Sequence, residues 1–584
     1  MKIARCAVAL SSLAFALGCG GGGMGGGSGS SLVLSLANNS AQVFPGQAAV
    51  AIDATLTRTG STGNVTLSVS GLPQGATDTV QSPGAGNGGS VSFDAGTALP
   101  GTYSVTVLAS DGTVSSSEGL SLTVGAAATI ANTKGPAFSV AMSTSFQPAE
   151  WDNAFFTLNP TATTPLGNLG SHHIRLQGVS QGVPQTSATT WNFGIIDDIT
   201  QPVLTVTDHS PEFQIAVAPA FMYDPGHNFL DPTYAQFAAY TQNLVRYYNV
   251  PGGFTAPDGP HASPSGTPIT WWGIYNEPNF NNLDSAQYTA LYNKVVPAMQ
   301  SVDASLKYAA VELGDYSGLA NQFLPAFVSG VTAHVDVLAT HFYSTCNQKD
   351  DDTKVFGSVP GFATEVGDIY TQLGTNPALA NVPVWVTENN VNADYDAGNN
   401  ISACNGTTFV TDQRGSSPFF AAWRPYVFSQ LGKANVKALY HWDYGADAQF
   451  GEVDYNTGAL QLSYWVDYWL GQMFPPTSGA QLLDYSSTDD AELETLPVMN
   501  SDGSVVIMVA NHAVNATGDN NGPGALRTVL IDTSALGSFS SASLLMIDKT
   551  TSVANGPTPA SVTVAPQTII PLNGYSVAFL SLKP

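Results

Sequence analysis

Residues 130–475 alternate between short apolar stretches and longer helical patterns, and this alternation restricts the fold more than any other feature of the chain. The apolar stretches predict eight strands, near residues 138–145, 172–177, 213–221, 269–276, 307–313, 335–343, 382–388 and 436–443. Helical periodicity lies between them, near residues 233–248, 285–303, 318–329, 361–374, 416–432 and 460–473. Eight strands with interleaved helices are typical of a (β/α)₈ TIM barrel.

Two β-rich regions flank the predicted barrel. Residues 31–127 contain alternating runs such as 65–69 and 103–107, which Pro and Gly turns separate, and they predict an N-terminal Ig-like β-sandwich. This region has almost no aromatic residues, so we expect a spacer there. Residues 476–584 return to strand patterning, for example at 504–509, and predict a C-terminal accessory β-sandwich. The chain is therefore predicted to be multidomain.

The N-terminus has the pattern of an export signal. Lys2 and Arg5 precede a short apolar stretch, which is typical of a signal peptide over residues 1–18. The segment before Cys19 resembles the lipobox of bacterial lipoproteins, which implies a lipid on the Cys19 sulfur. The Gly-rich residues 19–30 predict a flexible tether. We expect an exported lipoprotein at the bacterial cell surface or outer membrane, and ordinary secretion is the alternative.

The charge of the chain excludes one class of partner. There are 17 Lys+Arg against 43 Asp+Glu, and the formal net charge is −26 at pH 7. Nucleic-acid binding needs clustered cations, so we expect no nucleic-acid partner. The Gly/Asn/Asp-containing loop 517–524 lacks the ligand spacing of a known calcium motif, and no calcium site is predicted there. The sequence leaves the oligomeric state open.

Cysteine usage also fits export. If Cys6 leaves with the signal peptide and Cys19 carries a lipid, only Cys346 and Cys404 remain. Two remaining cysteines in an oxidising compartment predict one disulfide bond. Two free buried thiols are the alternative, and two Cys residues are too few for a typical zinc site. The bridge would join the loops that follow the sixth and seventh predicted strands.

Two glutamates, Glu277 and Glu388, end predicted strands. Pro278 follows Glu277 directly and stops its strand. In a (β/α)₈ barrel, strand C-terminal ends meet at the face where catalysis takes place. Glycoside hydrolysis uses such a pair: one carboxyl protonates the leaving oxygen, and in retaining enzymes the other attacks the sugar from about 5–5.5 Å away. For either glutamate alone, a solvated charge at a strand end is the alternative.

Around these glutamates the sequence resembles glycoside hydrolase clan A, with Asn276-Glu277-Pro278 on a fourth strand and Glu388 on a seventh. The finer similarity is to family 39, which includes β-xylosidases. Segments similar to motifs of that family occur in the family's order, at residues 173–178, 191–197, 274–279, 341–343, 387–390, 440–442 and 502–505. The resemblance covers residues 130–584.

The resemblance implies a role for each matching residue. Glu277 is expected to be the acid/base and Glu388 the nucleophile. Asn276 is expected to bind the 2-hydroxyl of the sugar. Tyr343 is expected to donate a hydrogen bond to the nucleophile and to fix its rotamer.

Three further residues carry an implied role and a simpler alternative. Arg175 is expected to hold Glu388 ionised through charge-assisted bonds, or it forms a structural ion pair. Trp442 is expected to form the floor of the sugar subsite, or it is part of the core. His341 is expected to orient its neighbours, or it is a buried histidine with satisfied hydrogen bonds. His173 has no assigned role.

The sequence departs from the family in its substrate loops. Asn389-Asn390 stands where the family usually has an aromatic or aliphatic residue before Asn. The loop 344–358 has no match, and the acidic substrate contacts after the eighth strand are represented only by the candidates Asp447 and Glu452. These departures concern the sugar specificity more than the chemistry.

The sequence thus predicts a retaining glycoside hydrolase with a carbohydrate substrate and no metal or other cofactor. A β-xylosidase-like exo-enzyme is the nearest specific prediction. An endo-acting exopolysaccharide hydrolase is the alternative within the class, because a spacer and a lipid tether suit a bulky polymer. An iduronidase-like activity fits less well, since the barrel offers few cations besides Arg175 and Arg414 for a uronate. The alternative from another class is a non-catalytic carbohydrate-binding surface protein.

Overall fold

The computed structural model describes residues 29–146, 160–177, 183–206, 212–314 and 320–584. The predicted signal peptide, Cys19 and most of the predicted tether lie outside the described residues. The chain divides into two compact units. The first comprises the residues up to Thr97 together with Thr102–Thr123, and the second comprises Ala98–Gly101 and Val124–Pro584. Among the described helices, none has both the length and the apolar character that crossing a membrane requires.

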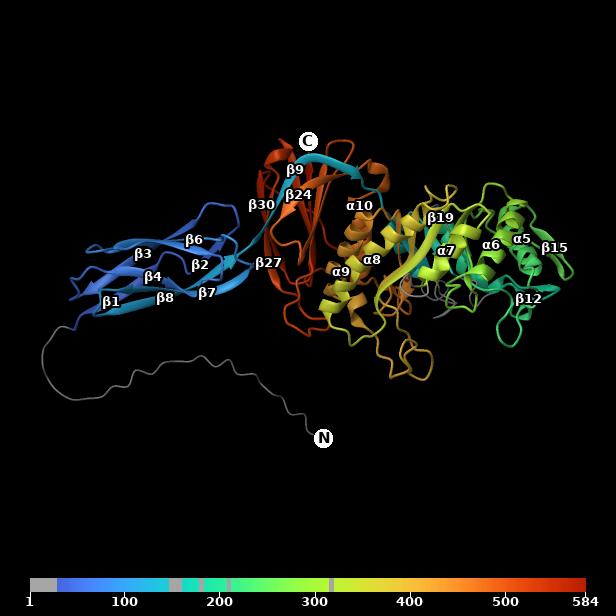
Figure 1. Cartoon of the computed structure of the whole chain (residues 1–584), viewed down its shortest axis with the longest axis horizontal. Coiled ribbons are helices and arrows are strands. Elements are labelled where there is room, and N and C mark those ends of the chain that lie inside the picture. The colour runs from blue at the N-terminus through green and yellow to red at the C-terminus, as the bar shows by residue number, and fades with distance from the viewer. Residues whose placement is uncertain (1–28, 147–159, 178–182, 207–211, 315–319) are drawn as a thin grey trace, which may run out of the picture. The chain divides into compact units, whose positions relative to one another are not determined.

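The first unit contains two four-stranded sheets (Figure 1). The sheet orders are β1 (Ser31–Leu36), β3 (Val50–Thr59), β6 (Gly88–Asp94), β5 (Thr77–Gln81), and β2 (Ser40–Val43), β8 (Ser115–Val124), β7 (Gly101–Ser110), β4 (Thr66–Ser70). Burial alternates along β3, where Ile52, Ala54 and Leu56 are buried between exposed neighbours, as a half-buried strand requires. The region is β-rich as predicted, and its Ig-like class stays a prediction.

The second unit contains a closed barrel of eight parallel strands. In order they are β10 (Ala141–Phe146), β11 (Ile174–Leu176), β14 (Glu212–Ile215), β17 (Trp271–Ile274), β18 (Lys307–Leu313), β19 (Val337–Thr345), β20 (Val384–Asn392) and β21 (Ala438–His441). The barrel closes where β10 pairs with β21. Each predicted strand overlaps one of these eight, so the predicted TIM barrel is confirmed.

Helices surround the barrel, and successive helices from α5 to α10 contact one another (Figure 1). They are α3 (Thr163–Leu169), α4 (Gly194–Val206), α5 (Ala235–Asn249), α6 (Ser285–Gln300), α7 (Ala320–Gly330), α8 (Asp352–Leu373), α9 (Pro418–Lys433) and α10 (Leu462–Met473). The predicted helix near 361–374 begins earlier, at Asp352, because the Asp351 side chain caps it by accepting from the Lys354 backbone N–H at 2.8 Å. α3 was not predicted from the sequence, because its seven residues include Pro and Gly.

Short elements decorate the loops. Three two-stranded sheets pair β12 (Gln185–Ser187) with β13 (Thr190–Trp191), β15 (Phe254–Ala256) with β16 (Gly259–His261), and β22 (Gly445–Ala446) with β23 (Val453–Asp454). The 3₁₀ turns are η1 (Pro160–Ala162), η3 (Ala220–Met222), η4 (Gln413–Gly415), η5 (Pro476–Ser478) and η6 (Ser534–Leu536). The first sheet and η3 follow barrel strands β11 and β14 in the chain.

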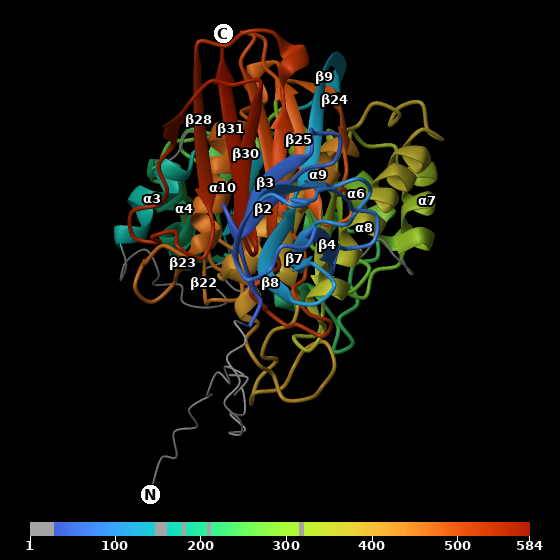
Figure 2. The ribbon, with the colours of Figure 1, turned by 90° about the vertical axis from the view of Figure 1, so that its left-hand side faces the viewer.

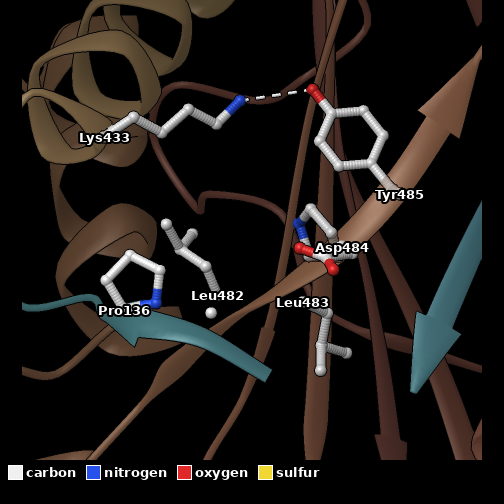
Figure 3. A pocket seen from close by; sticks show the side chains of 8 residues that line it. Pro136, Lys433, Leu482, Leu483, Asp484 and Tyr485 are labelled. Carbon is white, nitrogen blue, oxygen red and sulfur yellow. Dashed lines mark hydrogen bonds between the residues drawn. The ribbon is translucent and has the colours of Figure 1, made fainter. Parts of the chain in front are cut away.

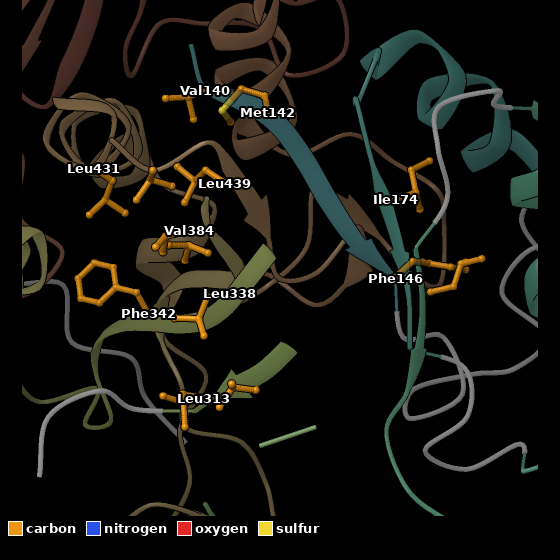
Figure 4. Close-up of a cluster of buried hydrophobic side chains, with 14 of the residues drawn as sticks. Val140, Met142, Phe146, Ile174, Leu313, Leu338, Phe342, Val384, Leu431 and Leu439 are labelled. Carbon is orange, nitrogen blue, oxygen red and sulfur yellow. The ribbon is translucent and has the colours of Figure 1, made fainter. Parts of the chain in front are cut away.

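The barrel strands are buried on both faces. Leu338, Val384 and Leu439 belong to the large core between strands and helices (Figure 4). The neighbouring residues Ala339 and Trp385 belong to a separate cluster. Because side chains of a strand alternate between its faces, this second cluster marks the inside of the barrel. The near-continuous apolar runs in the sequence follow from this double burial.

The C-terminal region forms a nine-stranded sheet, in which β28 lies beside β31 (Figure 2). Its order is β29 (Ala560–Val562), β28 (Ser541–Ile547), β31 (Ser576–Lys583), β26 (Val505–Asn511), β25 (Leu493–Met499), β24 (Gln481–Ser487), β9 (Ala126–Ala137), β27 (Leu526–Asp532) and β30 (Gln567–Asn573). Val505 and Ile507 lie in the sheet's own core, whereas Val506 and Met508 join the core of the barrel.

One strand of this sheet comes from far earlier in the chain. β9 pairs with β24 and β27, so residues 130–137 belong to the C-terminal sheet and not to the barrel, where the sequence analysis placed them. The sequence pattern predicts that β9 is a strand, but it does not predict which sheet the strand joins. The strands that pair with β9 are more than 300 positions away in the chain. The barrel itself begins at Ala141.

Candidate active site

Glu388 lies within β20, next to an irregularity of the barrel. The register between β19 and β20 shifts there, so that Thr387 is an extra residue on β20. Such a bulge lets successive side chains reach the same side of a strand. Thr387 donates to Glu312 at 2.5 Å and Glu388 accepts from Arg175 at 2.8 Å, and both contacts lie inside the barrel.

Glu277 stands just beyond the end of β17, where the chain turns out of the strand. Tyr275 and Glu277 have positive φ values of 68° and 44°, which are uncommon for residues other than glycine. The backbone N–H of Glu277 donates to the carbonyl of Glu312 at 3.0 Å, which fixes the turn to β18. Backbone strain of this kind concentrates at functional sites.

The two glutamates meet at His341. His341 Nδ1 lies 2.9 Å from Glu277 Oε1 and 3.4 Å from Glu388 Oε2. The three ligand atoms all lie within 4.8 Å of one another. The structure thus brings two carboxylates, which are far apart in the sequence, to one point at the C-terminal end of the barrel.

The two carboxylates have different surroundings. Glu388 is nearly buried, with 7% of its side chain exposed, and it accepts from Arg175 through Oε1 and from Tyr343 through Oε2 at 2.9 Å. Burial raises the pKa of Tyr343 well above its usual range, so the phenol keeps the proton that it donates. Glu277 is 27% exposed and faces the solvent side. Glu388 is therefore held as an acceptor, whereas Glu277 keeps one oxygen available.

Arg175 is buried and connects several groups. Its Nη1 donates to Glu388 at 2.8 Å and to Gln177 at 3.0 Å, and its Nη2 donates to Asn276 at 2.8 Å. A guanidinium presents its donors in a rigid fork, so this arrangement fixes Asn276 and Glu388 relative to each other. Arg175 thus forms a buried ion pair with Glu388, and its expected part in keeping Glu388 ionised for catalysis stays a prediction.

Glu312 is a site residue that the sequence analysis missed. It lies at a bulge in β18, where Val311 and Glu312 have positive φ values of 80° and 48°. Its Oε2 lies 3.3 Å from His341 Nε2 and 3.4 Å from Arg175 Nη2. The one signal for it in the sequence is an acidic residue within an otherwise apolar predicted strand.

Carboxylates face both ring nitrogens of His341. Burial disfavours its charged form, but the negative charge of Glu388 and the hydrogen bonds to Glu277 and Glu312 outweigh burial and raise the pKa of His341 to about 9. The ring is therefore an imidazolium at neutral pH, with Nδ1–H directed at the glutamate pair and Nε2–H at Glu312.

A second acidic pair lies deeper in the barrel. Burial opposes the charge on Glu312, but Arg175 and His341 outweigh burial and lower the pKa of Glu312 to about 2. Burial and the charge of Glu312 together raise the pKa of Glu212 to about 8. Glu212 accepts from Tyr440 at 2.9 Å and was also missed from the sequence. At neutral pH, Glu312 is ionised and Glu212 keeps its proton.

Trp442 lies at the margin of the site. It is 8% exposed and forms a small cluster with Ala446 and Phe450, against which Tyr343 packs. Its backbone N–H donates to the carbonyl of Asn389 at 3.1 Å. Tyr343, which packs against this cluster, is also the residue that donates to Glu388.

The two asparagines that depart from the family pattern are buried and bonded. Asn389 donates to the carbonyl of Phe342 at 2.7 Å and accepts from Arg424. Asn390 donates to the carbonyl of Trp442 at 2.5 Å. Both side chains therefore support β20 and the segment after β21, and neither is directed at the glutamates by these bonds.

The loops above the site are joined as predicted. Cys346, after β19, and Cys404, in the loop after β20, form a disulfide with a Cα–Cα distance of 5.8 Å. The two residues after β21 that were candidates for substrate contacts both have hydrogen-bond partners within the protein. Glu452 is fully buried, where Thr144 donates to it at 2.6 Å, and Asp447 accepts from the backbone of its own turn.

Two groups of side chains have the donors and spacing to hold a metal ion. Within the described residues they are Glu277, His341 and Glu388, and His441, Glu452 and Asp467. Each group already has an arginine in contact: Arg175 lies 2.8 Å from Glu388, and Arg424 lies 2.8 Å from Asp467. Because a guanidinium repels a metal cation, both groups suit ion pairs better than a metal.

A separate hollow of about 280 Å³ lies between β9, β24 and α9 (Figure 3). Lys433 reaches across it to the hydroxyl of Tyr485 at 3.3 Å and pairs with Glu494 at 2.6 Å. The predicted site residues do not line it; its charged lining residues are Lys433, which is already paired, and Asp484. We assign it no part in the chemistry.

No family model matches this sequence, and no curated protein matches it. Solved structures do match. A monomeric β-xylosidase from Caulobacter crescentus CB15 is 13% identical, with a TM-score of 0.55 over 78% of this chain and 99% of that one. An α-L-arabinofuranosidase from Thermotoga maritima is 11% identical, with a TM-score of 0.56 over 79% and 100%.

A glycoside hydrolase family 39 enzyme from Xanthomonas axonopodis pv. citri is 14% identical, with a TM-score of 0.52 over 78% of this chain and 97% of that one. This chain shares the fold of these glycoside hydrolase structures. At such identities the likeness concerns the fold alone, so the chemistry must be argued from the site.

Proposed function

We propose that this protein is a retaining glycoside hydrolase. The observation that carries the proposal is the meeting of Glu277 and Glu388 beside His341, where one carboxylate oxygen of each glutamate lies within 4.8 Å of one oxygen of the other. Retaining enzymes separate their carboxyl groups by about 5–5.5 Å, which leaves no space for the intervening water of an inverting enzyme.

The reaction divides into two displacements. Glu388 attacks the anomeric carbon, the glycosidic C–O bond breaks, and Glu277 gives its proton to the leaving oxygen. Glu277 then takes a proton from a water molecule whose oxygen attacks the same carbon, and the bond to Glu388 breaks. The free sugar leaves, and both glutamates return to their starting protonation states.

The surroundings of the two glutamates favour this assignment over the reverse. Glu388 accepts from a guanidinium and a phenol, which stabilise its negative charge before the attack. Glu277 accepts from the imidazolium of His341 through Oε1, so Oε2 is free to carry the transferable proton. Glu277 is also the more exposed of the two, as a group that meets both leaving group and water must be.

The substrate that we propose is an extracellular oligosaccharide or polysaccharide. A β-xylosidase-like activity is the nearest specific proposal, since the structural neighbours include a β-xylosidase and the motif segments resemble family 39. Arg175 Nη2 donates to Asn276 Oδ1 at 2.8 Å, which fixes the orientation of the Asn276 amide. This fixed amide supports the proposal that Asn276 binds the 2-hydroxyl of the sugar. Export with a lipid on Cys19 is part of the proposal, because a surface enzyme meets its polymer outside the cell.

Covalent labelling tests the proposal. A panel of 2-deoxy-2-fluoro glycosides (xyloside, glucoside, galactoside and arabinofuranoside) is expected to include one that adds one glycosyl mass per chain, and peptide mapping is expected to locate it on Glu388. The Glu388→Gln variant serves as the blank, because an amide does not trap the sugar. Absence of label from the whole panel, or label on another residue, would contradict the proposal.

A further inference from the structure

A cavity of about 650 Å³ opens beside Glu277 and takes no part in the mechanism above. Its walls come from the loops after β11, β14 and β17, with Thr186, Ala218 and Asn281 as representatives. These are the second, third and fourth strands of the barrel, so the cavity lies at the strand that carries Glu277. A volume of this size is within the range of small-molecule sites.

Phe280 connects the cavity to Glu277. It lines the cavity with 56% of its surface exposed, which is high for a large apolar residue. A Cβ placed on Gly314 would lie 2.5 Å from Glu277 Oε1 and would clash with the ring of Phe280 as well. The ring edge and the carboxylate oxygen therefore lie side by side over Gly314, where only glycine fits.

The walls of the cavity are fixed by hydrogen bonds. The hydroxyls of Tyr223 and Tyr275 are 3.0 Å apart, and the backbone N–H of Ala218 donates to Tyr223 at 3.0 Å. The Asn281 side chain donates to the carbonyl of Glu277 at 3.2 Å, which holds the segment that carries Phe280. The cavity is therefore a preformed surface beside the acid/base candidate.

The chemistry of the walls selects the occupant. The described lining residues include amides, hydroxyls and aromatic rings, such as Gln185, Asn282 and Tyr223, and none of them is Lys, Arg, Asp or Glu. Sugars without charge bind through such amides and hydroxyls and stack their apolar C–H faces on aromatic rings. His227 also lines the cavity. A uronate or a sulfated sugar is best held by a lysine or an arginine, and the described lining residues include neither.

We propose that this cavity binds the leaving-group side of the substrate, as a subsite for at least one neutral sugar stacked on Phe280. This inference rests on the proposed function, because the acid/base defines which side the leaving group occupies. Glu277 protonates the leaving oxygen, so the departing sugar lies next to Glu277 and away from Glu388. A built leaving-group subsite favours oligosaccharide or internal chain cleavage over the removal of a small aglycone.

Reactivation of the labelled enzyme tests this subsite. In 2-fluoroglycosyl-Glu388 enzyme, the hydroxyl of an acceptor attacks the anomeric carbon, the bond to Glu388 breaks, and Glu277 takes the hydroxyl proton. Xylobiose and cellobiose are used as neutral acceptors and digalacturonate as a charged one, and each rate is divided by the rate in buffer alone. We expect a neutral acceptor to accelerate reactivation at least tenfold and digalacturonate to have no effect.

Three variants locate the acceptor. In Phe280→Ala, the acceleration by the neutral acceptor is expected to be about 3- to 10-fold smaller than in the wild type. This is the range expected for the loss of one aromatic contact. Phe280→Tyr keeps a ring and is expected to retain it, as is Leu526→Ala, which removes an equally exposed side chain from the C-terminal sheet. Circular dichroism and thermal unfolding confirm that each variant is folded.

The outcomes separate the two proposals. If no glycoside labels Glu388, the proposed function is wrong. If the label forms but neither neutral acceptor speeds its release, or if Phe280→Ala responds as the wild type does, the subsite is wrong and the proposed function stands. Acceleration by digalacturonate equal to that by xylobiose would overturn the assignment to neutral sugars.

Discussion

The barrel contains two pairs of glutamates that differ in depth and in partners. The outer pair, Glu277 and Glu388, meets at the C-terminal end of the barrel, and both keep some solvent exposure. The inner pair, Glu212 and Glu312, is completely buried. All four side chains are glutamates with the same carboxyl group. They differ in burial and in hydrogen-bond partners, and these differences set their protonation and their access to solvent.

Two cations lie between the pairs. Arg175 bonds to Glu388 at 2.8 Å and reaches Glu312 at 3.4 Å, while His341 contacts both glutamates of the outer pair and Glu312. A buried cation is tolerated only with a counter-charge. Glu312, the ionised member of the inner pair, therefore supplies negative charge that keeps Arg175 and His341 charged, and the outer pair is the one to which we assign the reaction.

The largest effect is expected at the nucleophile. Glu388→Gln removes the carboxylate that attacks the sugar, so turnover is expected to fall by about 10⁴-fold or more, with folding intact. Initial rates on the aryl glycoside that gives the best wild-type turnover measure this. Glu118→Gln, an exposed glutamate of the first unit, is the matched control and should retain wild-type turnover. Residual turnover above one per cent would remove Glu388 from its role.

Glu277→Gln is expected to have a smaller effect that depends on the leaving group. General acid catalysis contributes about 10²- to 10⁴-fold, and a good leaving group needs less of it. We therefore expect a large loss of kcat/KM with an unactivated disaccharide and a small loss with a dinitrophenyl glycoside. The slope of log kcat/KM against leaving-group pKa measures this difference. An equal loss with all leaving groups would assign Glu277 another role.

The outer pair was predictable from the sequence and the inner pair was not. Glu277 and Glu388 each end an apolar run beside Asn, and the barrel topology then brings strand ends together whatever the exact boundaries. Arg175, Tyr343 and Trp442 followed from the resemblance of their motifs. The disulfide followed from the cysteine count together with the predicted export, which leaves Cys346 and Cys404 in an oxidising compartment.

Glu212 and Glu312 gave no comparable signal. Glu212 begins the short strand β14 directly after residues outside the described structure, and from the sequence it reads as a strand-end charge. Glu312 sits in an apolar strand where a bulge directs it into the barrel. The direction of a side chain at a bulge depends on the neighbouring strand's register, which local sequence does not encode. The exchange of β9 into the C-terminal sheet was missed for the same reason, since it depends on tertiary pairing.

Glu312→Gln removes the counter-charge of the inner pair without changing the shape of the side chain. With one negative charge gone, the pKa of His341 is expected to fall from about 9 toward its ordinary value of 6.5. If the imidazolium supports the outer pair, the alkaline limb of the kcat/KM profile shifts to lower pH, and activity at pH 8 falls by about tenfold.

The pH profile and an NMR titration of the His341 ring measure this shift directly. Glu312→Asp, which restores the charge, should recover part of the alkaline limb. A merely structural role would lower activity equally at every pH and leave the His341 titration unmoved, and that result would separate the inner pair from the chemistry.

The smallest effect on activity is expected for Glu212→Gln. Since the pKa of Glu212 is raised to about 8, its carboxyl is protonated at pH 6.5, and an amide replaces it closely. We expect kcat/KM at pH 6.5 to change by no more than about twofold, in contrast with Glu312→Gln.

Stability is where Glu212 should be visible. A folded-state pKa above the ordinary 4.5 gives a stabilisation that is complete below pH 4.5 and is lost as the pH rises through about 8. The wild type should therefore lose free energy of unfolding between pH 5 and 9, and Glu212→Gln, which cannot ionise, should lose less. Urea unfolding at pH 5, 7 and 9 measures the two slopes. His341 contributes a slope of the same sign between pH 6.5 and about 9, so the variant's slope should shrink without vanishing. Equal slopes would show that Glu212 is ionised in the barrel, and the inner pair would then carry two charges rather than one.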